Sequence, residues 1–224
     1  MVRITVRPVL HTLSKPAGIP VFPPHAHPDG DCLLQRLLAA EPERAQVAWP
    51  QGFAGGLAHR LDVGTSGAVA VAADPAQLAA LRQAFAEGAL HKTYRFLSAR
   101  EVPWDDNSCD RPIAHDRRRK RRMVVRRGKG TPHRGKWHPA LTTFHRRGPR
   151  LWEATMSTGV MHQIRVHAAF VGLVLAGDPI YGGGEPPTAV ADLGPAAPFC
   201  LHHLGFTGAF TTAAVPLPRW AEAP

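Results

Sequence analysis

One short segment places a carboxylate between an arginine and a polar turn that contains glycine. It reads His-Arg-Leu-Asp-Val-Gly-Thr-Ser-Gly over residues 59–67, and Asp62 is the carboxylate. Gly64 and Gly67 can adopt backbone angles that other residues avoid, so a ligand can approach the main chain there. An ionised carboxylate in such a place can attack or stabilise an electron-poor carbon. On this segment alone, the commoner role for an aspartate beside glycine and serine is to cap a turn.

A second segment contains an arginine that could face this carboxylate. Residues 162–167 read His-Gln-Ile-Arg-Val-His, and on a helix Arg165 could point into a cleft while Ile164, Ala168 and Val171 pack inward. A guanidinium beside an aspartate favours the ionised carboxylate, which is the nucleophilic form. The alternative is that Arg165 holds the fold together through an ion pair with another acid.

A predicted strand carries a third reactive group. Residues 92–97 alternate as Lys-Thr-Tyr-Arg-Phe-Leu, which puts Lys92, Tyr94 and Phe96 on one face. A strand tyrosine is more often part of the core, with its hydroxyl at the edge.

These segments, in this order, resemble the motifs of the RluA-type pseudouridine synthases. The likeness extends from about residue 11 to about residue 206. It implies an α+β fold with a mixed, largely antiparallel sheet flanked by helices. It also implies that Asp62 is the catalytic nucleophile, that Arg165 lies beside it, and that Tyr94 stacks on the target base or accepts a proton.

The reaction of this family converts a uridine in RNA into its C-glycoside. The C1′–N1 bond breaks and a C1′–C5 bond forms without redox change, so no cofactor or metal is required in principle. The resemblance implies that Arg60 fills the gap left by a flipped-out nucleotide, and the alternative for Arg60 is a phosphate contact. The other motif residues expected to contact substrate or RNA are His59, Thr65, Lys92, His162 and Gln163.

The positive charge of the chain is concentrated in one block. The net charge is +10, but residues 111–150 hold 15 Lys and Arg against the single acid Asp116, and the rest of the chain has a balance of −4. RNA phosphates suit such a block through counterion release. The alternatives are a solvated, partly disordered loop and, less favoured without an apolar anchor, an anionic membrane surface. The block's core, expected to contact RNA, is Arg117, Arg118, Arg119, Lys120, Arg121 and Arg122.

One residue departs from the family pattern. The family usually has Thr-Gly-Arg before His-Gln-Ile-Arg, whereas this chain has Val160 after Thr158 and Gly159. Loss of a guanidinium removes five donors, so a contact is lost unless the basic block replaces it. The departure bears on the choice of RNA more than on the chemistry.

Two other classes of function compete with this assignment. An RNA-binding protein or RNA chaperone on the same fold, without turnover, would carry the same basic block. A metal site at His25 and His27, or at His202 and His203, lacks Cys or acidic partners at ligand spacing, so we expect no metal.

Two helices are predicted from caps and apolar spacing. Asp31 is expected to cap a helix with leucines at 33, 34, 37 and 38 that ends at Glu41. Asp74, followed by Pro75 and Gln77, predicts a second helix that ends at Gly88.

The remaining elements follow from similar patterns. Residues 11–21 predict a strand and a Pro/Gly turn, residues 68–73 and 151–156 predict strands, and a helix is expected to begin near Val160. Residues 178–182 resemble a family segment that we expect to be a structural turn, and residues 201–206 are expected to be core strand.

Length and composition set the organisation. The chain has 224 residues, 44% of them hydrophobic, and we expect a single catalytic domain over 1–224. The basic block is expected to be an RNA-contacting insertion in this domain. We expect no separate N-terminal RNA-binding module. The chain shows neither a run of ~18 apolar residues nor a signal-peptide core, which predicts a soluble cytoplasmic protein without an obligate protein partner. Three scattered cysteines predict reduced, buried thiols.

Overall fold

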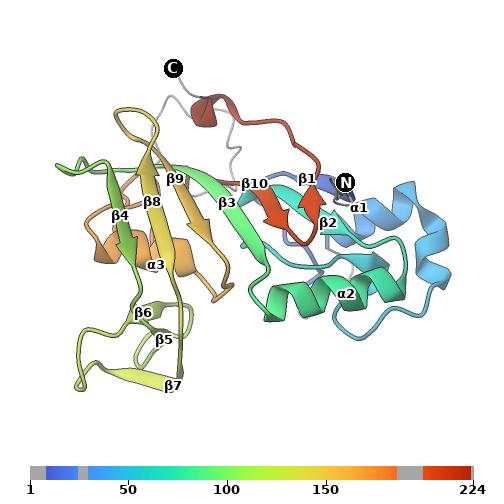
Figure 1. Ribbon diagram of the computed structural model, residues 1–224, viewed down its shortest axis with the longest axis horizontal. Coiled ribbons are helices and arrows are strands. Elements are labelled where there is room, and N and C mark those ends of the chain that lie inside the picture. Colours follow the sequence, from blue (N-terminus) through green and yellow to red (C-terminus); the bar gives the residue numbers. More distant parts are fainter. Residues whose placement is uncertain (1–8, 25–29, 186–198, 223–224) are drawn as a thin grey trace, which may run out of the picture.

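The computed structural model describes residues 9–24, 30–185 and 199–222, which form two sheets and three α-helices (Figure 1). The strands of the larger sheet are β1 (Val9–Lys15), β2 (Ser66–Val71), β3 (Leu90–Leu97), β4 (Asp106–Cys109), β8 (Thr142–Arg146), β9 (Leu151–Met156), β10 (Leu201–Gly208) and β11 (Thr211–Thr212). Their order is β11-β1-β2-β10-β3-β9-β8-β4. Only β1 with β11 and β2 with β10 pair in parallel among these described strands, which confirms the predicted mixed, largely antiparallel sheet.

The helices lie at opposite ends of this sheet. Helices α1 (Leu33–Ala40) and α2 (Pro75–Ala86) lie at the end formed by β1 and β2, and α3 (Gln163–Phe170) lies beside β8 and β9 (Figure 1). Helix α2 begins and ends as predicted, because the Asp74 side chain accepts the Gln77 N–H at 2.8 Å and Gly88 adopts a φ of 69° after its last turn.

The predicted cap of α1 is wrong. The Cys32 sulfur accepts the Gln35 N–H at 3.4 Å, whereas the Asp31 carboxylate pairs with Arg36. The helix starts one position later than an Asp31 cap would allow, and Cys32 has the extended backbone of an N-cap residue.

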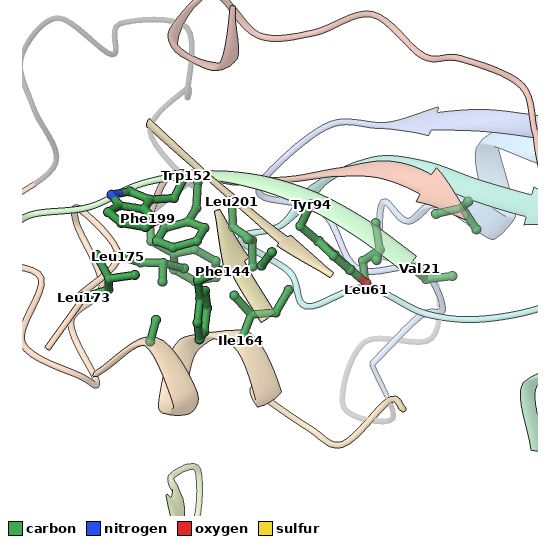
Figure 2. Close-up of a cluster of buried hydrophobic side chains, with 14 of the residues drawn as sticks. Val21, Leu61, Tyr94, Phe144, Trp152, Ile164, Leu173, Leu175, Phe199 and Leu201 are labelled. Atoms are coloured by element: carbon green, nitrogen blue, oxygen red, sulfur yellow. The ribbon is translucent and has the colours of Figure 1, made fainter. Parts of the chain in front are cut away.

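The main core fixes α3 against the sheet. Ile164 and Ala168 of α3 are buried, as predicted, in one core cluster with Phe144 of β8 and Trp152 of β9. Figure 2 shows Ile164 beside Phe144. Burial of one such side chain stabilises the fold by about 1.5–3 kcal/mol. Because its neighbours on α3 are held in this core, Arg165 projects in one direction only.

Helix α3 begins at Gln163 and not near Val160. His162, directly before it, has the left-handed backbone angles φ 55° and ψ 20°, which cannot continue a right-handed helix. The segment from Ser157 to Met161 is therefore a loop.

The basic block is folded. Strands β5 (Ile113–Asp116), β6 (Met123–Val125) and β7 (His133–His138) form the smaller sheet in the order β6-β5-β7. Arg117 to Arg122 form the hairpin loop between β5 and β6, where the Asp116 carboxylate accepts the N–H groups of Arg118 at 2.7 Å and Arg119 at 3.1 Å. The alternative of a disordered loop therefore does not hold for this hairpin.

Two further predictions concern cysteines and membrane spans. Cys32, Cys109 and Cys200 are all free thiols and all buried, which confirms the prediction. Within the described ranges, no helix combines the length and the apolar character needed to cross a bilayer.

Candidate active site

Asp62 lies on the tight turn that leads into β2. The Thr65 N–H donates to the Asp62 carbonyl at 3.0 Å, and the Val63 carbonyl accepts the Gly18 N–H at 2.8 Å. The Asp62 side chain is 31% exposed, and its described hydrogen bond goes to Arg165 rather than to the backbone of its own turn. The turn therefore presents the carboxylate to a neighbouring element.

Lys15 holds this turn in place through hydrogen bonds to backbone carbonyls. Sequence reasoning did not assign this residue to the site. Its fully buried ammonium group donates to the carbonyls of Pro16 at 2.8 Å, Ile19 at 2.7 Å and Val63 at 3.2 Å. Burial lowers the pKa of Lys15 to about 8, although the charge of Asp62 acts in the opposite direction. The Lys-Pro-x-Gly pattern at residues 15–18 was the signal available in the sequence.

The glycines of the turn have a different use from the one expected. Of the two glycines in this described segment, only Gly67 has a positive φ, at 117°. A Cβ atom on Gly67 would lie 2.1 Å from the His203 carbonyl oxygen. Gly67 therefore permits the close approach of β10 to β2, and not the approach of a ligand.

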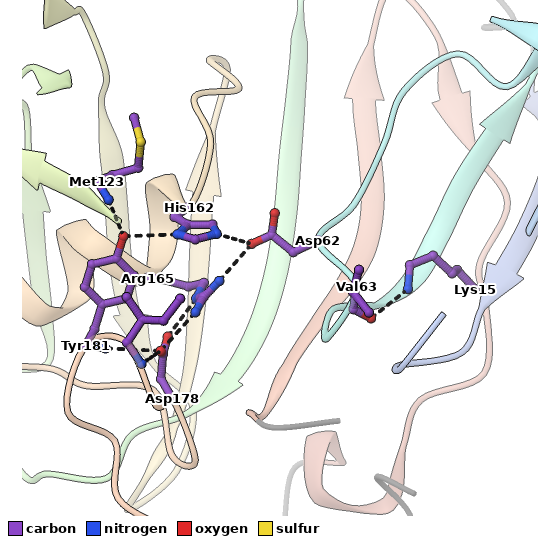
Figure 3. Close-up of polar contacts among 9 residues, drawn as sticks. Lys15, Asp62, Val63, Met123, His162, Arg165, Asp178 and Tyr181 are labelled. Carbon is purple, nitrogen blue, oxygen red and sulfur yellow. Dashed lines mark hydrogen bonds and ion pairs between the residues drawn. The ribbon is translucent and has the colours of Figure 1, made fainter. Parts of the chain in front are cut away.

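Arg165 contacts two carboxylates at once (Figure 3). Its Nη1 lies 3.2 Å from Asp62 Oδ2, while Nε and Nη2 donate to the two oxygens of Asp178 at 2.7 and 3.0 Å. Both alternatives for Arg165 are thus present, the fold-holding pair with Asp178 and the contact with Asp62. Burial lowers the pKa of Arg165, but the bonds to Asp178 and the charges of both carboxylates raise it above its ordinary value.

Asp178 is the partner that sequence reasoning missed. It is fully buried, and its Oδ1 also accepts the N–H groups of Ile180 at 2.9 Å and Tyr181 at 3.2 Å. Residues 178–182 were expected to be only a structural turn. They do form a turn, and Asp178 within it fixes the orientation of the Arg165 guanidinium.

Tyr94 is buried on β3 beside a residue that was expected to be plain core. Its ring stacks on His203 of β10 with centroids 4.4 Å apart and planes 30° apart. His203 is itself oriented by the Ala68 carbonyl, to which its Nδ1 donates at 2.6 Å. Burial, with the charge of Asp62, raises the pKa of Tyr94 well above its usual range. The phenol is therefore held neutral and in a fixed orientation.

Asp62, Tyr94 and Arg165 line a cleft of about 1150 Å³. Ten of the predicted site residues border it, namely His59, Arg60, Asp62, Thr65, Lys92, Tyr94, Arg121, His162, Gln163 and Arg165. Arg117, Arg118, Arg119 and Lys120 are exposed on the hairpin and are not part of the described cleft wall. Arg122 instead packs over the Tyr181 ring, 5.5 Å from its centroid.

Two of the bordering side chains are hydrogen-bonded within the protein, and a third is buried. His59 Nε2 accepts the Ala70 N–H at 3.1 Å, and burial lowers the pKa of His59. The Gln163 amide donates to the Leu141 carbonyl at 2.9 Å and accepts the Val160 N–H at 3.1 Å. Thr65 is 2% exposed. These contacts shape the cleft wall, and contact with RNA remains a prediction for all three.

Lys92 and Arg60 place basic groups at the cleft. The Lys92 ammonium donates to the Thr158 carbonyl at 3.1 Å, and burial lowers the pKa of Lys92 to about 8. Arg60 is exposed at the cleft border, where its guanidinium is accessible to a polyanion.

The histidine pairs give no support to a metal centre. His202 Nδ1 contacts the Ser66 hydroxyl at 2.8 Å, and His203 bonds to the Ala68 carbonyl. In the part of the chain that the structure describes, no group of three or more ligand side chains could hold a metal ion. His25 and His27 lie outside the described residues.

Comparison with known proteins identifies the family. Residues 9–170 match the family model described as RNA pseudouridylate synthase. The chain belongs to this family. It is 35% identical over 169 residues to an uncharacterized RNA pseudouridine synthase of Chloroflexus aurantiacus, covering 75% of this chain and 51% of the relative. It is 34% identical over 202 residues to ribosomal large subunit pseudouridine synthase D of Neisseria meningitidis serogroup B, covering 87% and 51%.

Solved structures confirm the pseudouridine synthase fold. Human RNA pseudouridylate synthase domain containing 1 superposes with a TM-score of 0.66 at 20% identity, covering 97% of this chain and 87% of the human chain. The human domain containing 4 protein gives the same TM-score at 21% identity, with 96% and 90% covered. Against its curated relatives from Chloroflexus and Neisseria, this synthase-family chain spans about half of their length.

Proposed function

We propose that this member of the synthase family isomerises a uridine in ribosomal or transfer RNA to pseudouridine, with Asp62 as the nucleophile. The observation that carries the proposal is the contact between the partly exposed Asp62 carboxylate and Arg165, whose guanidinium is fixed by buried Asp178. Several curated relatives are named for the ribosomal large subunit, which supports ribosomal RNA as the substrate.

The reaction requires that C1′ of the ribose change its partner within one nucleotide. As the C1′–N1 bond breaks, the Asp62 carboxylate stabilises or bonds to the electron-poor carbon. The uracil then turns so that C5 bonds to C1′, the carboxylate is released, C5 loses its hydrogen and N1 gains one. Arg165 holds the carboxylate in a fixed orientation throughout.

The structure favours one of the two functions expected of Tyr94. A phenol whose pKa is raised by burial stays protonated, so it is a poor proton acceptor. Its ring is held by His203 on one side. We therefore assign Tyr94 to stacking on the target base rather than to proton abstraction.

The basic hairpin supplies the RNA-binding surface of the proposal. Its exposed arginines lead to Arg121, the member of the Arg117–Arg122 run that borders the cleft. Arg121 therefore brings a guanidinium to the cleft, where Val160 replaces the usual arginine of the family. RNA backbone contacts would run from the hairpin to the flipped nucleotide.

Replacement of Asp62 by asparagine tests the chemistry directly. Asp62→Asn should abolish pseudouridine formation and leave RNA affinity within about threefold, because the basic surface is unchanged. Asp31→Asn is a matched control, since it removes an exposed carboxylate that pairs with Arg36. Wild-type modification by Asp62→Asn would refute the nucleophile.

A map of pseudouridine in cellular RNA separates the enzyme from a non-catalytic RNA chaperone. Cells with and without the gene should differ at one or more uridines. Restoration of these sites by the wild-type gene, but not by the Asp62→Asn gene, would identify the substrate. Identical maps would favour the chaperone.

A further inference from the structure

His162 has an unusual backbone conformation at the edge of the cleft. It is the one non-glycine residue with positive φ in the described ranges. Histidine, asparagine and aspartate tolerate this region better than most residues, and strained residues are often found at functional sites. The conformation places the imidazole between Tyr181 and Asp62 (Figure 3).

The hydrogen bonds around Tyr181 favour one of the two tautomers of neutral His162. The Met123 N–H donates to the Tyr181 hydroxyl oxygen at 2.9 Å. The hydroxyl hydrogen is then available for His162 Nδ1, 3.1 Å away. With Nδ1 as the acceptor of this bond, a neutral His162 carries its hydrogen on Nε2. Burial lowers the pKa of His162, which favours the neutral ring.

The protonated Nε2 faces the Asp62 carboxylate. It lies 3.8 Å from Oδ2, the same oxygen that Arg165 Nη1 contacts at 3.2 Å. Asp62 Oδ1 makes no hydrogen bond to a described residue. The separation at His162 exceeds a hydrogen bond, and catalytic bonds often shorten when substrate fills a site.

We propose that His162 is a positioning residue for Asp62. Oriented by Tyr181, it donates its Nε2 hydrogen to Oδ2 when the cleft is filled, so that Oδ1 is the oxygen that approaches the ribose carbon. This inference rests on the proposed function of Asp62. Tyr181 also links His162 to the basic hairpin. Its hydroxyl group accepts a hydrogen bond from Met123, the first residue of β6, and its ring packs against Arg122.

Two amide substitutions separate positioning from a structural contribution. In His162→Gln the side-chain nitrogen can reach the place of Nε2, whereas in His162→Asn it reaches only the place of Nδ1. Asparagine tolerates left-handed backbone angles better than glutamine, so His162→Asn should be the more stable variant. The activities should have the opposite order.

Single-turnover release of tritium measures this order, with [5-³H]uridine-labelled total RNA from cells that lack the gene as the probe. His162→Asn should lower the rate about tenfold or more, the effect of losing a hydrogen bond to a charged group. His162→Gln should retain most of the rate, and Tyr181→Phe should lower it as His162→Asn does. His91→Gln, which changes an exposed histidine of β3, is the control. Activities that follow thermal stability, or equal loss in both amide variants, would overturn the proposal.

Nitrogen-15 NMR of the histidines gives a readout that needs no activity. His162 should show a protonated Nε2 and an unprotonated Nδ1, and Tyr181→Phe should remove this preference. A proton on Nδ1 in the wild-type protein would overturn the inference. If the wild-type protein releases no tritium but shows the expected tautomer, the proposed function fails while the orientation of His162 stands.

Discussion

The two carboxylates on Arg165 should differ sharply when each is neutralised. Asp178 is fully buried and accepts two bonds from the guanidinium and two from backbone N–H groups. The Asp62 side chain is partly exposed and accepts one hydrogen bond, from Arg165 at 3.2 Å. The first carboxylate belongs to the fold, and the second is available for chemistry.

The expected magnitudes follow from burial. Asp178→Asn removes the charge that compensates the buried guanidinium, a change that costs about 3–5 kcal/mol in free energy of unfolding. The remaining contact with Asp62 places the loss near the lower end of this range. Asp62→Asn leaves the Arg165–Asp178 pair intact, so it should cost about 1 kcal/mol or less.

Urea unfolding followed by circular dichroism measures both values, and tritium release gives the activities of the same preparations. We expect Asp62→Asn to be folded, stable and inactive, and Asp178→Asn to be clearly destabilised. If Asp62→Asn lost as much stability as Asp178→Asn, Asp62 would be a structural partner of Arg165 and the division of functions would be wrong.

Two further predictions concern pH and salt. Burial lowers the pKa of His202 to about 4 and the pKa of His203 to about 3. Below about pH 6.5 the unfolded chain therefore binds more protons than the folded protein. The free energy of unfolding should fall by about 2 kcal/mol per histidine between about pH 7.5 and pH 5. Urea unfolding at the two pH values measures this loss, and His203→Gln should show a smaller one; pH-independent stability would contradict both assignments. Replacement of Arg117–Arg122 by glutamine should flatten the salt dependence of RNA affinity, whereas an unaltered slope would mean that the hairpin does not contact phosphates.

Local patterns predicted the elements that carry their own signals. The cap, proline and apolar spacing at Asp74 and Pro75 determine α2 without help from the rest of the chain. The alternation at 92–97 likewise predicted β3, on which Tyr94 and Phe96 of the predicted common face are buried. Cys32 was missed as a cap because a thiol is a weak acceptor and Asp31 is the stronger candidate on propensity alone.

Partners distant in sequence carried no such signal. Asp178 follows Arg165 on another element, and nothing local in residues 178–182 shows that its carboxylate turns toward the guanidinium. The left-handed conformation of His162 was equally hidden, because histidine does not mark a helix start as serine or aspartate does. Both features involve contacts between the start of α3 and residues 178–181.

The charge of Asp62 shows how the fold assembles the site from separate elements. Burial is the largest influence on the pKa of Lys15, Tyr94, His162 and Arg165, and the charge of Asp62 acts to raise the pKa of all four. These side chains come from β1, β3 and the start of α3. One carboxylate is thus electrostatically coupled to a buried ammonium, a neutral phenol, a neutral imidazole and a guanidinium. The carboxylate therefore acts on side chains from three separate elements and not only within its own loop, which is the clustering of perturbed pKa values that the proposed function of Asp62 requires.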